Sequence, residues 1–539
     1  MKKMKTLLAL VLVAALCLAL FAACAKTETP ATPAEPAKTD TTPAKTEEPA
    51  KTEEPAKTEE PAKTDEPAEP AEPEEIVDLV MYFFDLRMIG ADHGPRIVDT
   101  INAYIGEKYG LNVDITYFVI GEWLTKVQLA IGSGERVDLM QLGAGSDVVT
   151  LHARNMLMDI NPYVEENAPG ALELMSKYMG PYRMDGGLYG FPTFRGYVTN
   201  QYIIMRKDIL EELNLVEKAE NMSSLTEFEE IMEAVRDNYT ADQGLWAVSK
   251  NSGASCVPAG LWNGDKFEDS FTWDTLLDSA SQILTDDQGN VSWLLDDPRQ
   301  AEKLARVATW ADRGFIYPDS ALTDVHGDEL MKQGISFSML DRSEYGVEAV
   351  KGNNCGHEVV CVKYQDGIIV TDSLTGWGVG VPITAEEPEA ACRMIDALYT
   401  DEYLMNVLIR GIEGVDYELV DGEVVYSDAP HYYEADFLIG NNLLLHPLAG
   451  QGADYFKEIK KINDDAELGT YMGFTMDRSN IELIIGNMTA VNDQYTNTFG
   501  TGGYTPELFA EYKNKLIGAG VEDYLADVQN QLTAFLAAQ

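Results

Sequence analysis

Two tryptophans that stand among loop residues are the side chains of this sequence best suited to holding a ligand. Trp262 lies in the run Gly-Leu-Trp-Asn-Gly, and Trp377 lies in the run Thr-Gly-Trp-Gly. Such a ring can stack on the apolar C–H face of a sugar, while Asp, Asn, Gln and Arg side chains bond the sugar hydroxyls. Either ring could equally pack within its own loop. We interpret both tryptophans as candidate ligand contacts.

No short motif of a catalytic centre accompanies these rings. The sequence has no G-x-S-x-G, no H-E-x-x-H, no Walker loop and no G-x-G-x-x-G after a strand-like run. The glycine-rich stretches at 142–145 and 501–504 indicate turns, because no P-loop lysine follows them. Acidic residues are so numerous that no pair stands out as a glycosidase dyad, which leaves a glycan-active enzyme open as an alternative.

The elements that must position a site begin as alternating strand and helix patterns. Residues 77–84 and 137–142 are apolar runs, and 113–117 alternates as a strand does. Apolar residues recur at helical spacing over 96–108 and again over 123–131, and a glycine follows each run. This order predicts a doubly wound α/β sheet.

In a doubly wound sheet, ligands bind beyond the carboxyl ends of the strands. The predicted strands place residues 82–85 and 141–147 at that edge. Phe84, Asp85 and Gln141 are therefore candidate ligand contacts.

The N-terminus has the pattern of a bacterial lipoprotein signal peptide over residues 1–23. Three lysines precede an uncharged apolar run from Leu7 to Phe21, which is short for a membrane span. Ala22 and Ala23 then precede Cys24, as in a lipobox, where the peptide is cut before a cysteine that carries lipid, palmitate included. An ordinary signal peptide with an incidental cysteine is the alternative.

Residues 24–75 predict a disordered tether rich in Pro, Glu, Lys and Thr. From Ala44 to Pro67 the hexapeptide Ala-Lys-Thr-Glu/Asp-Glu-Pro occurs four times. Such a segment has no apolar surface to bury, so it cannot offset its ordering entropy. Regular prolines keep it extended over on the order of 100 Å.

The charge balance excludes a nucleic-acid partner held in a basic groove. The 539 residues include 89 acidic and 40 basic side chains, for a formal net charge of −49. So acidic a chain is soluble and is repelled by anionic lipid headgroups.

Metal and disulfide signals are weak. The six histidines are scattered, no C-x-x-C occurs, and Asp286-Asp-Gln-Gly-Asn290 lacks the downstream glutamate of an EF-hand. We expect no metal and no cofactor. Free buried thiols are the expectation for four cysteines, with one disulfide left open in an exported chain: Cys256, Cys355, Cys361 and Cys392.

Short motifs occur in order along the folded part, from about residue 77 to the C-terminus. They are Trp123–Asp138 with Ser-Gly-Glu-x-x-Asp, Gly186–Pro192 with Gly-x-x-Tyr-Gly-x-Pro, Tyr202–Leu210 with Arg-Lys-Asp, Trp310–Asp319, Val381–Glu389, Arg410–Tyr417 and Ala519–Tyr524. This ordered set resembles the motifs of the family 1 extracellular solute-binding proteins, and the later ones resemble its lipoprotein, carbohydrate-type branch.

The resemblance implies a two-lobed, periplasmic-binding-protein-like α/β fold (type II), in which each lobe is a doubly wound sheet flanked by helices and a hinge joins the lobes. It implies that lobe 1 takes residues 77–194 and 377–445, and that lobe 2 takes 195–376 and 446–539. Trp377 would then stand where the chain crosses back.

The same resemblance implies further cleft residues. Arg195 and Tyr197 follow the turn by which the chain would leave the first lobe. Asp341 and Arg342 follow a strand-like run, 335–340, and would face the cleft from the second lobe.

The function implied is that of a lipid-anchored receptor on the outer face of the cell membrane of a bacterium, Gram-positive by its tether. It would deliver a small-molecule solute, with an oligosaccharide favoured and a peptide left open, to the permease subunits of an ABC importer. The receptor would act as a monomer and do no chemistry. A surface-tethered glycan-active enzyme and a tethered adhesin remain as alternatives.

Overall fold

The computed structural model describes residues 76–119, 121–251, 255–323, 325–427 and 429–538. The predictions of a signal peptide, a lipidated Cys24 and a tether therefore lie outside the described residues. Within the described ranges, no helix is both long enough and apolar enough to cross a bilayer.

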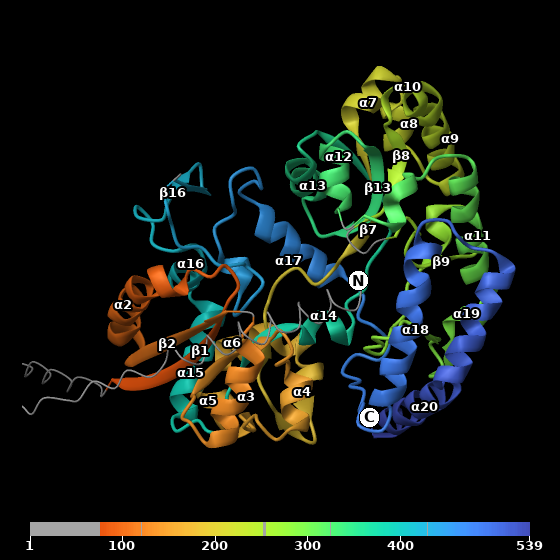
Figure 1. The fold of residues 1–539 in the computed structure, drawn as a ribbon. Helices are drawn as coiled ribbons and strands as arrows, with labels where there is room; N and C mark the ends of the chain where they lie inside the picture. Colours follow the sequence, from red (N-terminus) through yellow and green to blue (C-terminus); the bar gives the residue numbers. More distant parts are fainter. Residues whose placement is uncertain (1–75, 120, 252–254, 324, 428, 539) are drawn as a thin grey trace, which may run out of the picture. The chain divides into compact units, whose positions relative to one another are not determined.

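A first mixed sheet and its helices form what we call the first lobe (Figure 1). Its strands are β1 Val77–Asp85, β2 Leu111–Val119, β3 Leu139–Gly143, β6 Phe191–Pro192 and β15 Trp377–Gly380. Its helices are α2 Gly90–Tyr109, α3 Trp123–Ser133, α4 Val148–Ala153, α5 Asn161–Asn167, α6 Pro169–Met175, α15 Pro388–Thr400 and α16 Glu402–Arg410. The strand order is β2-β1-β3-β15-β6, with β1 parallel to both neighbours and β15 antiparallel to β3 and β6.

The predicted alternation of strand and helix over 77–142 is confirmed. Helix α2 buries three isoleucines four residues apart, Ile97, Ile101 and Ile105, and ends at Gly110, whose φ of 64° suits glycine. It begins at Gly90 rather than at 96. The carboxylate of Asp85 accepts the N–H groups of Ile89 at 3.0 Å and Gly90 at 2.8 Å, so a residue distant from the apolar pattern starts the helix.

A second mixed sheet and its helices form the second lobe. Its strands are β7 Asn200–Arg206, β8 Trp246–Ser249, β13 Ser336–Ser343 and β14 Val359–Gln365. Its helices are α7 Lys207–Glu212, α8 Val216–Glu220, α9 Leu225–Val235, α10 Ala241–Gln243, α11 Pro298–Asp312, α12 Gly327–Lys332 and α13 Val347–Cys355. The order is β14-β7-β13-β8, with β7 antiparallel to both neighbours and β13 parallel to β8. The two-lobed α/β fold expected from the sequence is thus confirmed.

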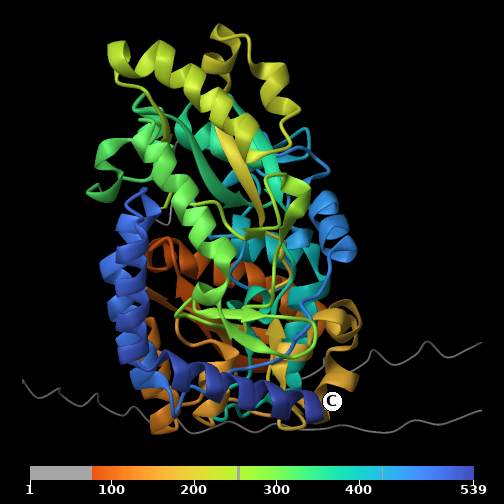
Figure 2. The same cartoon turned by 90° about the vertical axis from the view of Figure 1, so that its right-hand side faces the viewer.

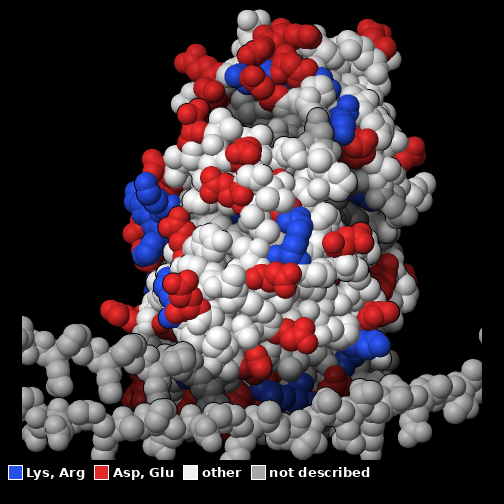
Figure 3. Space-filling model, turned by 90° about the vertical axis from the view of Figure 1, so that its left-hand side faces the viewer, with Lys and Arg blue, Asp and Glu red and all other residues white. Residues whose placement is uncertain are grey.

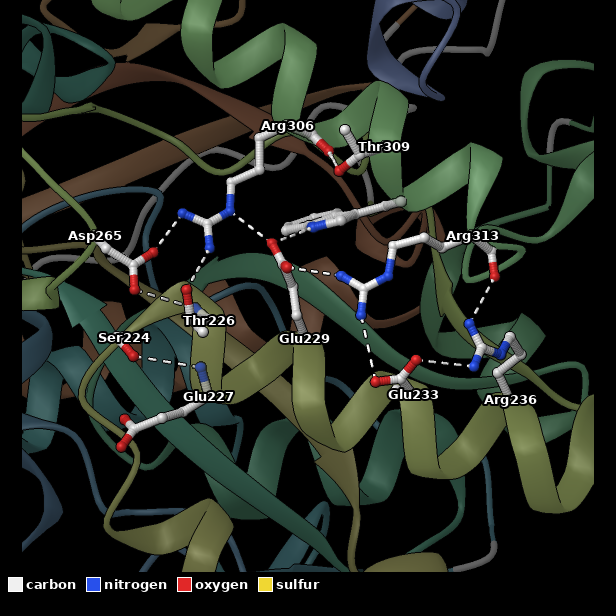
Figure 4. Close-up of polar contacts among 11 residues, drawn as sticks. Ser224, Thr226, Glu227, Glu229, Glu233, Arg236, Asp265, Arg306, Thr309 and Arg313 are labelled. Atoms are coloured by element: carbon white, nitrogen blue, oxygen red, sulfur yellow. Dashed lines mark hydrogen bonds and ion pairs between the residues drawn. The ribbon is translucent and has the colours of Figure 1, made fainter.

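A network of ion pairs ties α9 to α11 within the second lobe (Figure 4). Glu229 of α9 accepts hydrogen bonds from Arg306 Nε at 2.6 Å, from Arg313 Nη1 at 2.8 Å and from the indole N–H of Trp310 at 2.8 Å. Arg306 also pairs with Asp265. One carboxylate therefore satisfies three donors of one helix.

Residues Ser224 to Glu227 form half of a capping box at the start of α9. Ser224 accepts the N–H of Glu227 at 3.3 Å, as an N-cap does. The Glu227 carboxylate, however, accepts from the N–H and hydroxyl of Ser223, one residue before the cap.

The C-terminal helices build a separate apolar core. They are α18 Glu482–Gly500, α19 Pro506–Ala519 and α20 Val521–Ala538, and they pack with the hairpin β11 Ile283–Thr285 and β12 Val291–Trp293. Figures 1 and 2 show these helices, in blue, lying together beside α11. The turn of the hairpin is Asp286–Asn290, where the Asp286 carboxylate accepts from Gln288 and Asn290, as expected of a simple turn.

Short elements join these parts. They are the strands β4 Arg183–Met184, β5 Gly187–Leu188, β9 Leu261–Trp262, β10 Ser270–Phe271, β16 Tyr417–Val420 and β17 Glu423–Tyr426, the helices α14 Thr371–Thr375 and α17 Tyr455–Asp465, and the 3-10 turn η7 Asn442–Leu444. The core of the first lobe includes residues up to Val198 and from Ile369 to Leu445. The chain thus leaves and re-enters that core near the expected crossings, while the lobe boundaries themselves stay a prediction.

The face drawn in Figure 3 carries acidic side chains among a larger area of uncharged residues. Figure 3 shows them spread over one face, with the basic side chains in smaller separate groups. All four cysteines beyond residue 75 are free thiols: Cys256, Cys355, Cys361 and Cys392.

Candidate functional site

Two neighbouring hollows lie at the start of β15, and one of them is also lined by residues that follow the carboxyl end of β3. We call the other the aromatic pocket; its volume is about 300 Å³. It is lined by Arg195, Gly196, Glu344, Trp377, Asp436, Phe437, Asn442, Leu443, Tyr455, Phe456 and Ile459. Its walls come from both lobes and from α17, as a site between lobes requires.

Rings form one wall of the aromatic pocket. Trp377 lies 5.3 Å from Phe437 and 5.6 Å from Phe84, between ring centroids. Tyr455 lies 5.0 Å from Phe456 in an edge-on arrangement. The four rings that line this pocket, Trp377, Phe437, Tyr455 and Phe456, are all partly exposed. A planar, partly apolar ligand can stack on such faces.

Charged groups face the rings. Arg195 Nη1 lies 3.4 Å from the Glu344 carboxylate, and its other bonds go to the carbonyl groups of Gly196 and Ser373. Burial raises the pKa of Glu344, the guanidinium of Arg195 opposes that rise, and the like charge of Asp436 adds to it. Glu344 and Asp436 therefore line the same pocket, from different lobes.

A glycine makes room for one of these acids. A Cβ on Gly196 would lie 2.5 Å from Oε2 of Glu344, so only glycine lets the carboxylate approach the crossing segment.

The second hollow, the wide pocket, measures about 1110 Å³ and is more polar. Helix α4 and the residues on either side of it, 144–154, line one side, and residues 475–479 line the other. Asp147 accepts the N–H of Thr150 at 3.0 Å and so starts α4, and Arg478 donates to the carbonyl of Leu277 at 2.9 Å. Gly376 lines the wide pocket, and the next residue, Trp377, lines the aromatic pocket. The two hollows are therefore neighbours, and we treat them as one cleft.

Of the residues selected from the sequence, Arg195 and Trp377 line the aromatic pocket together. Trp377 is the first residue of strand β15, not a loop residue, because its backbone pairs with Gly143 of β3. Phe84 is buried directly behind it, in contact with Trp123 as well. Gln141 is also buried and accepts the N–H of Phe84 at 3.0 Å.

Three further residues, Asp85, Tyr197 and Trp262, line neither hollow. Asp85 is buried and caps α2, and Tyr197 is buried and donates its hydroxyl to the carbonyl of Thr193 at 2.8 Å. Trp262 was expected in a loop, but it lies in β9 and packs on Tyr364 at 5.9 Å in the core of the second lobe. Their contact with a ligand stays a prediction that no geometry here supports.

Asp341 and Arg342 lie inside β13 rather than after it. The strand runs on to Ser343 because β7 pairs with it as far as Asn200. Asp341 is buried and accepts from Lys351 Nζ at 2.6 Å, whereas Arg342 is exposed. Neither lines a hollow, and the cleft residue of this strand end is Glu344.

The sequence reasoning missed most of the pocket. A signal existed for Glu344, which closely follows the strand-like run 335–340, and for the ring pair Tyr455 and Phe456 at a helix start. No periodicity marks Asp436 and Phe437, which lie in an irregular segment.

No metal centre emerges among the described residues: they hold no group of three or more His, Cys, Asp or Glu side chains that could bind an ion.

Comparison with known families gives two matches. The family model described as bacterial extracellular solute-binding protein matches residues 94–405, more than half of the chain. A domain of unknown function (DUF3502) matches residues 470–537, which hold the three C-terminal helices.

Individual proteins from Streptococcus pneumoniae are similar over most of the chain. A carbohydrate ABC transporter substrate-binding protein is 20% identical over 468 residues, covering 83% of this chain and 89% of that protein. The N-glycan transport solute-binding protein NgtS superposes with a TM-score of 0.70 at 18% identity, covering 85% of this chain and 99% of that one. FusA in complex with kestose gives a TM-score of 0.57 at 14% identity, covering 86% and 100%. At these identities the structures support the fold alone.

Proposed function

Because the chain belongs to the bacterial extracellular solute-binding protein family, we propose that it is a receptor that binds an oligosaccharide and delivers it to an ABC importer. The observation that carries the proposal is the aromatic pocket, where ring faces stand opposite carboxylates and a guanidinium at the junction of two lobes. The names of the relatives, which are a carbohydrate transporter component, an N-glycan binder and a kestose complex, support this class of solute.

The pocket suits a sugar for a simple chemical reason. Trp377 and Tyr455 offer faces for the C–H side of a pyranose or furanose ring. Glu344 and Asp436 accept hydrogen bonds from hydroxyl groups, and Arg195 donates them. Among the residues selected from the sequence, we keep Arg195 and Trp377 as direct contacts, with Phe84 and Gln141 as the support behind the tryptophan.

Binding would work by closure of the lobes. A ligand that touches Trp377 and Asp436 on one side and Glu344 on the other has more contacts in a closed state, so it shifts the population toward closure by that difference in affinity. The closed receptor would then dock on the permease subunits. The chain itself would carry out no reaction.

In this proposal the N-terminal residues direct the protein to the membrane and anchor it there. Cleavage before Cys24 and attachment of a diacylglyceryl group, followed by palmitate or a similar chain, would anchor a monomer to the outer face of the membrane, since two acyl chains suffice for stable anchoring. Residues 24–75 would hold the folded part away from it.

A glycan panel with two readouts tests the receptor function. Unmodified protein is heated with Man1GlcNAc, Man5GlcNAc, kestose and unrelated sugars, and the same mixtures are analysed for products by mass spectrometry. A receptor gives a reversible rise in melting temperature, equivalent to about 2.7 kcal/mol at a ligand concentration 100 times the Kd, with the glycan unchanged. Turnover of a glycan would instead identify an enzyme, and binding only to immobilised surfaces would identify an adhesin.

A further inference from the structure

Arg410, the last residue of α16, is a fully buried charge with an incomplete set of hydrogen-bond partners. Its side chain is 0% exposed. Nε donates to the carbonyl of His446 at 3.3 Å and Nη2 donates to Asp436 Oδ2 at 3.1 Å, while Nη1 is buried and has no hydrogen-bond partner among the described residues. Burying a guanidinium that is incompletely paired is costly, and apolar residues of similar volume often replace such groups without loss of stability.

The one carboxylate that Arg410 holds belongs to the ligand site. Asp436 lines the aromatic pocket next to Phe437, and its side chain is 36% exposed. Oδ2 is bound to Arg410, whereas Oδ1 accepts no hydrogen bond from the described residues. A carboxylate fixed through one oxygen presents the other in one place, so a ligand can bond to it without ordering the side chain first.

The backbone around Asp436 is held from the same helix. The N–H of Glu434 donates to the carbonyl of Ile409, the residue before Arg410, at 2.7 Å. Arg410 thus completes the attachment of an otherwise irregular segment, residues 432–437, to the end of α16. Its planar fork fixes direction as well as charge, which a lysine ammonium does less well.

We propose that Arg410 is a positioning residue for the ligand site: from the interior of the first lobe it holds Asp436 so that Oδ1 accepts a hydrogen bond from a hydroxyl group of the bound sugar. This inference rests on the proposed receptor function. Arg410 itself touches no ligand.

The test compares Arg410→Met, Arg410→Lys, Asp436→Asn and the Arg410→Met/Asp436→Asn double variant in the full-length chain. Lys460→Met is the matched control, since it removes an exposed ion pair with Asp464 on α17, the helix that carries Tyr455. The ligand is whichever of Man1GlcNAc, Man5GlcNAc and kestose shifts the wild-type melting temperature most. Calorimetry gives affinity, and amide hydrogen exchange of residues 432–437 is read without ligand.

We expect Arg410→Met to weaken binding on the order of 10-fold or more, to speed exchange in 432–437, and to add nothing to Asp436→Asn in the double variant. Arg410→Lys should recover part of both effects, and Lys460→Met should match wild type. Unchanged exchange in 432–437, or additive losses in the double variant, overturns the proposal even where affinity falls. If Arg410→Met does not fold, the variants Arg410→Lys and Asp436→Asn still test the proposal. Affinities equal to that of the wild type in both of them reject the positioning role.

The same data separate this inference from the receptor function. Faster exchange in Arg410→Met, reversed in Arg410→Lys, with no wild-type binding to any of the three glycans, supports the positioning role and rejects the proposed solute class. Binding by wild type with no change in Arg410→Met rejects the positioning role alone.

Discussion

At the scale of single residues, Trp377 connects the sheet to the cleft. It begins β15, covers Phe84 on one side and meets Phe437 on the other. The ring is therefore partly structural and partly exposed to the aromatic pocket. This dual position makes it the residue where sequence reasoning and geometry agree best.

Replacing Trp377 with Ala should weaken oligosaccharide binding by about 1–2 kcal/mol, because a stacking face is lost. Calorimetry on the unmodified and variant proteins measures this. Trp246→Ala is the control: Trp246 is half-buried at the start of β8 and lines neither hollow, so it should change the melting temperature and leave affinity intact. An equal loss of affinity in both variants would mean that general destabilisation, and not stacking, is being measured.

Glu434 gives a second prediction at this scale, about pH. Glu434 is 0% exposed, and its carboxyl group lies against that of Asp85. Burial raises the pKa of Glu434 from 4.5 to about 9, and the hydrogen bond and the charge of Asp85 add to that rise. Glu434 is therefore protonated in the folded state and shares a hydrogen bond with Asp85. In the unfolded chain Glu434 ionises at its ordinary pKa.

The sign follows from that difference. The stability that protonated Glu434 gives is complete below about pH 4.5 and is lost as pH rises toward 9, with a slope of up to about 1.4 kcal/mol per pH unit. Glu434→Gln, which keeps a donor toward Asp85, should remove that slope from urea unfolding measured between pH 5 and 9. The exposed Glu418→Gln variant should keep it. A wild-type and a Glu434→Gln curve that run parallel over this range would contradict the prediction.

At the scale of elements, the attachment of α9 to α11 depends on one carboxylate. Glu229 accepts hydrogen bonds from Arg306, Trp310 and Arg313. Of these three, Arg306 alone has a second acid as well placed, Asp265. The two helices pack on the second sheet, and none of their residues lines either hollow. The network should therefore matter for stability and leave binding unaffected.

Glu229→Gln should lower the free energy of unfolding by about 1–3 kcal/mol, because two guanidinium groups lose the charge of a shared carboxylate and one of its two acceptor oxygens. Denaturant unfolding measures the loss. Glu230→Gln, one position along the same helix, breaks only an exposed pair with Lys218 and should cost at most about 1 kcal/mol. Equal stability of the two variants would show that the network contributes no more than an ordinary surface pair.

At the scale of the whole molecule, the proposal joins a folded receptor to an anchor. Cys24→Ala should release the protein into the medium or leave it unprocessed, because the lipid has no other attachment point. Fractionation of cells into membrane and medium measures this. Cys17→Ala, inside the apolar run of the leader, should leave retention unchanged. Membrane retention of Cys24→Ala at the wild-type level would falsify lipid anchoring.

The sequence by itself determined the features that depend on local pattern. Periodicity alone located the strands and helices from Val77 to Gly143, because a half-buried element repeats its apolar residues at a fixed spacing. Ordered motifs identified the family and its two-lobed fold. The predicted strand ends placed Phe84 and Gln141 at the carboxyl edge of the first sheet. Neither residue lines the aromatic pocket: Phe84 packs against Trp377, and Gln141 bonds to Phe84.

Only the tertiary structure decided which charges share the cleft. Glu344 and Asp436 are far apart in sequence, and they meet because β13 ends and segment 432–437 arrives at the same junction. Packing likewise determined the environments of Asp341 and Trp262. Asp341 is buried against Lys351, and Trp262 is buried against Tyr364, which is distant in the chain. An isolated charge or ring carries no periodicity, so its environment is fixed by packing alone.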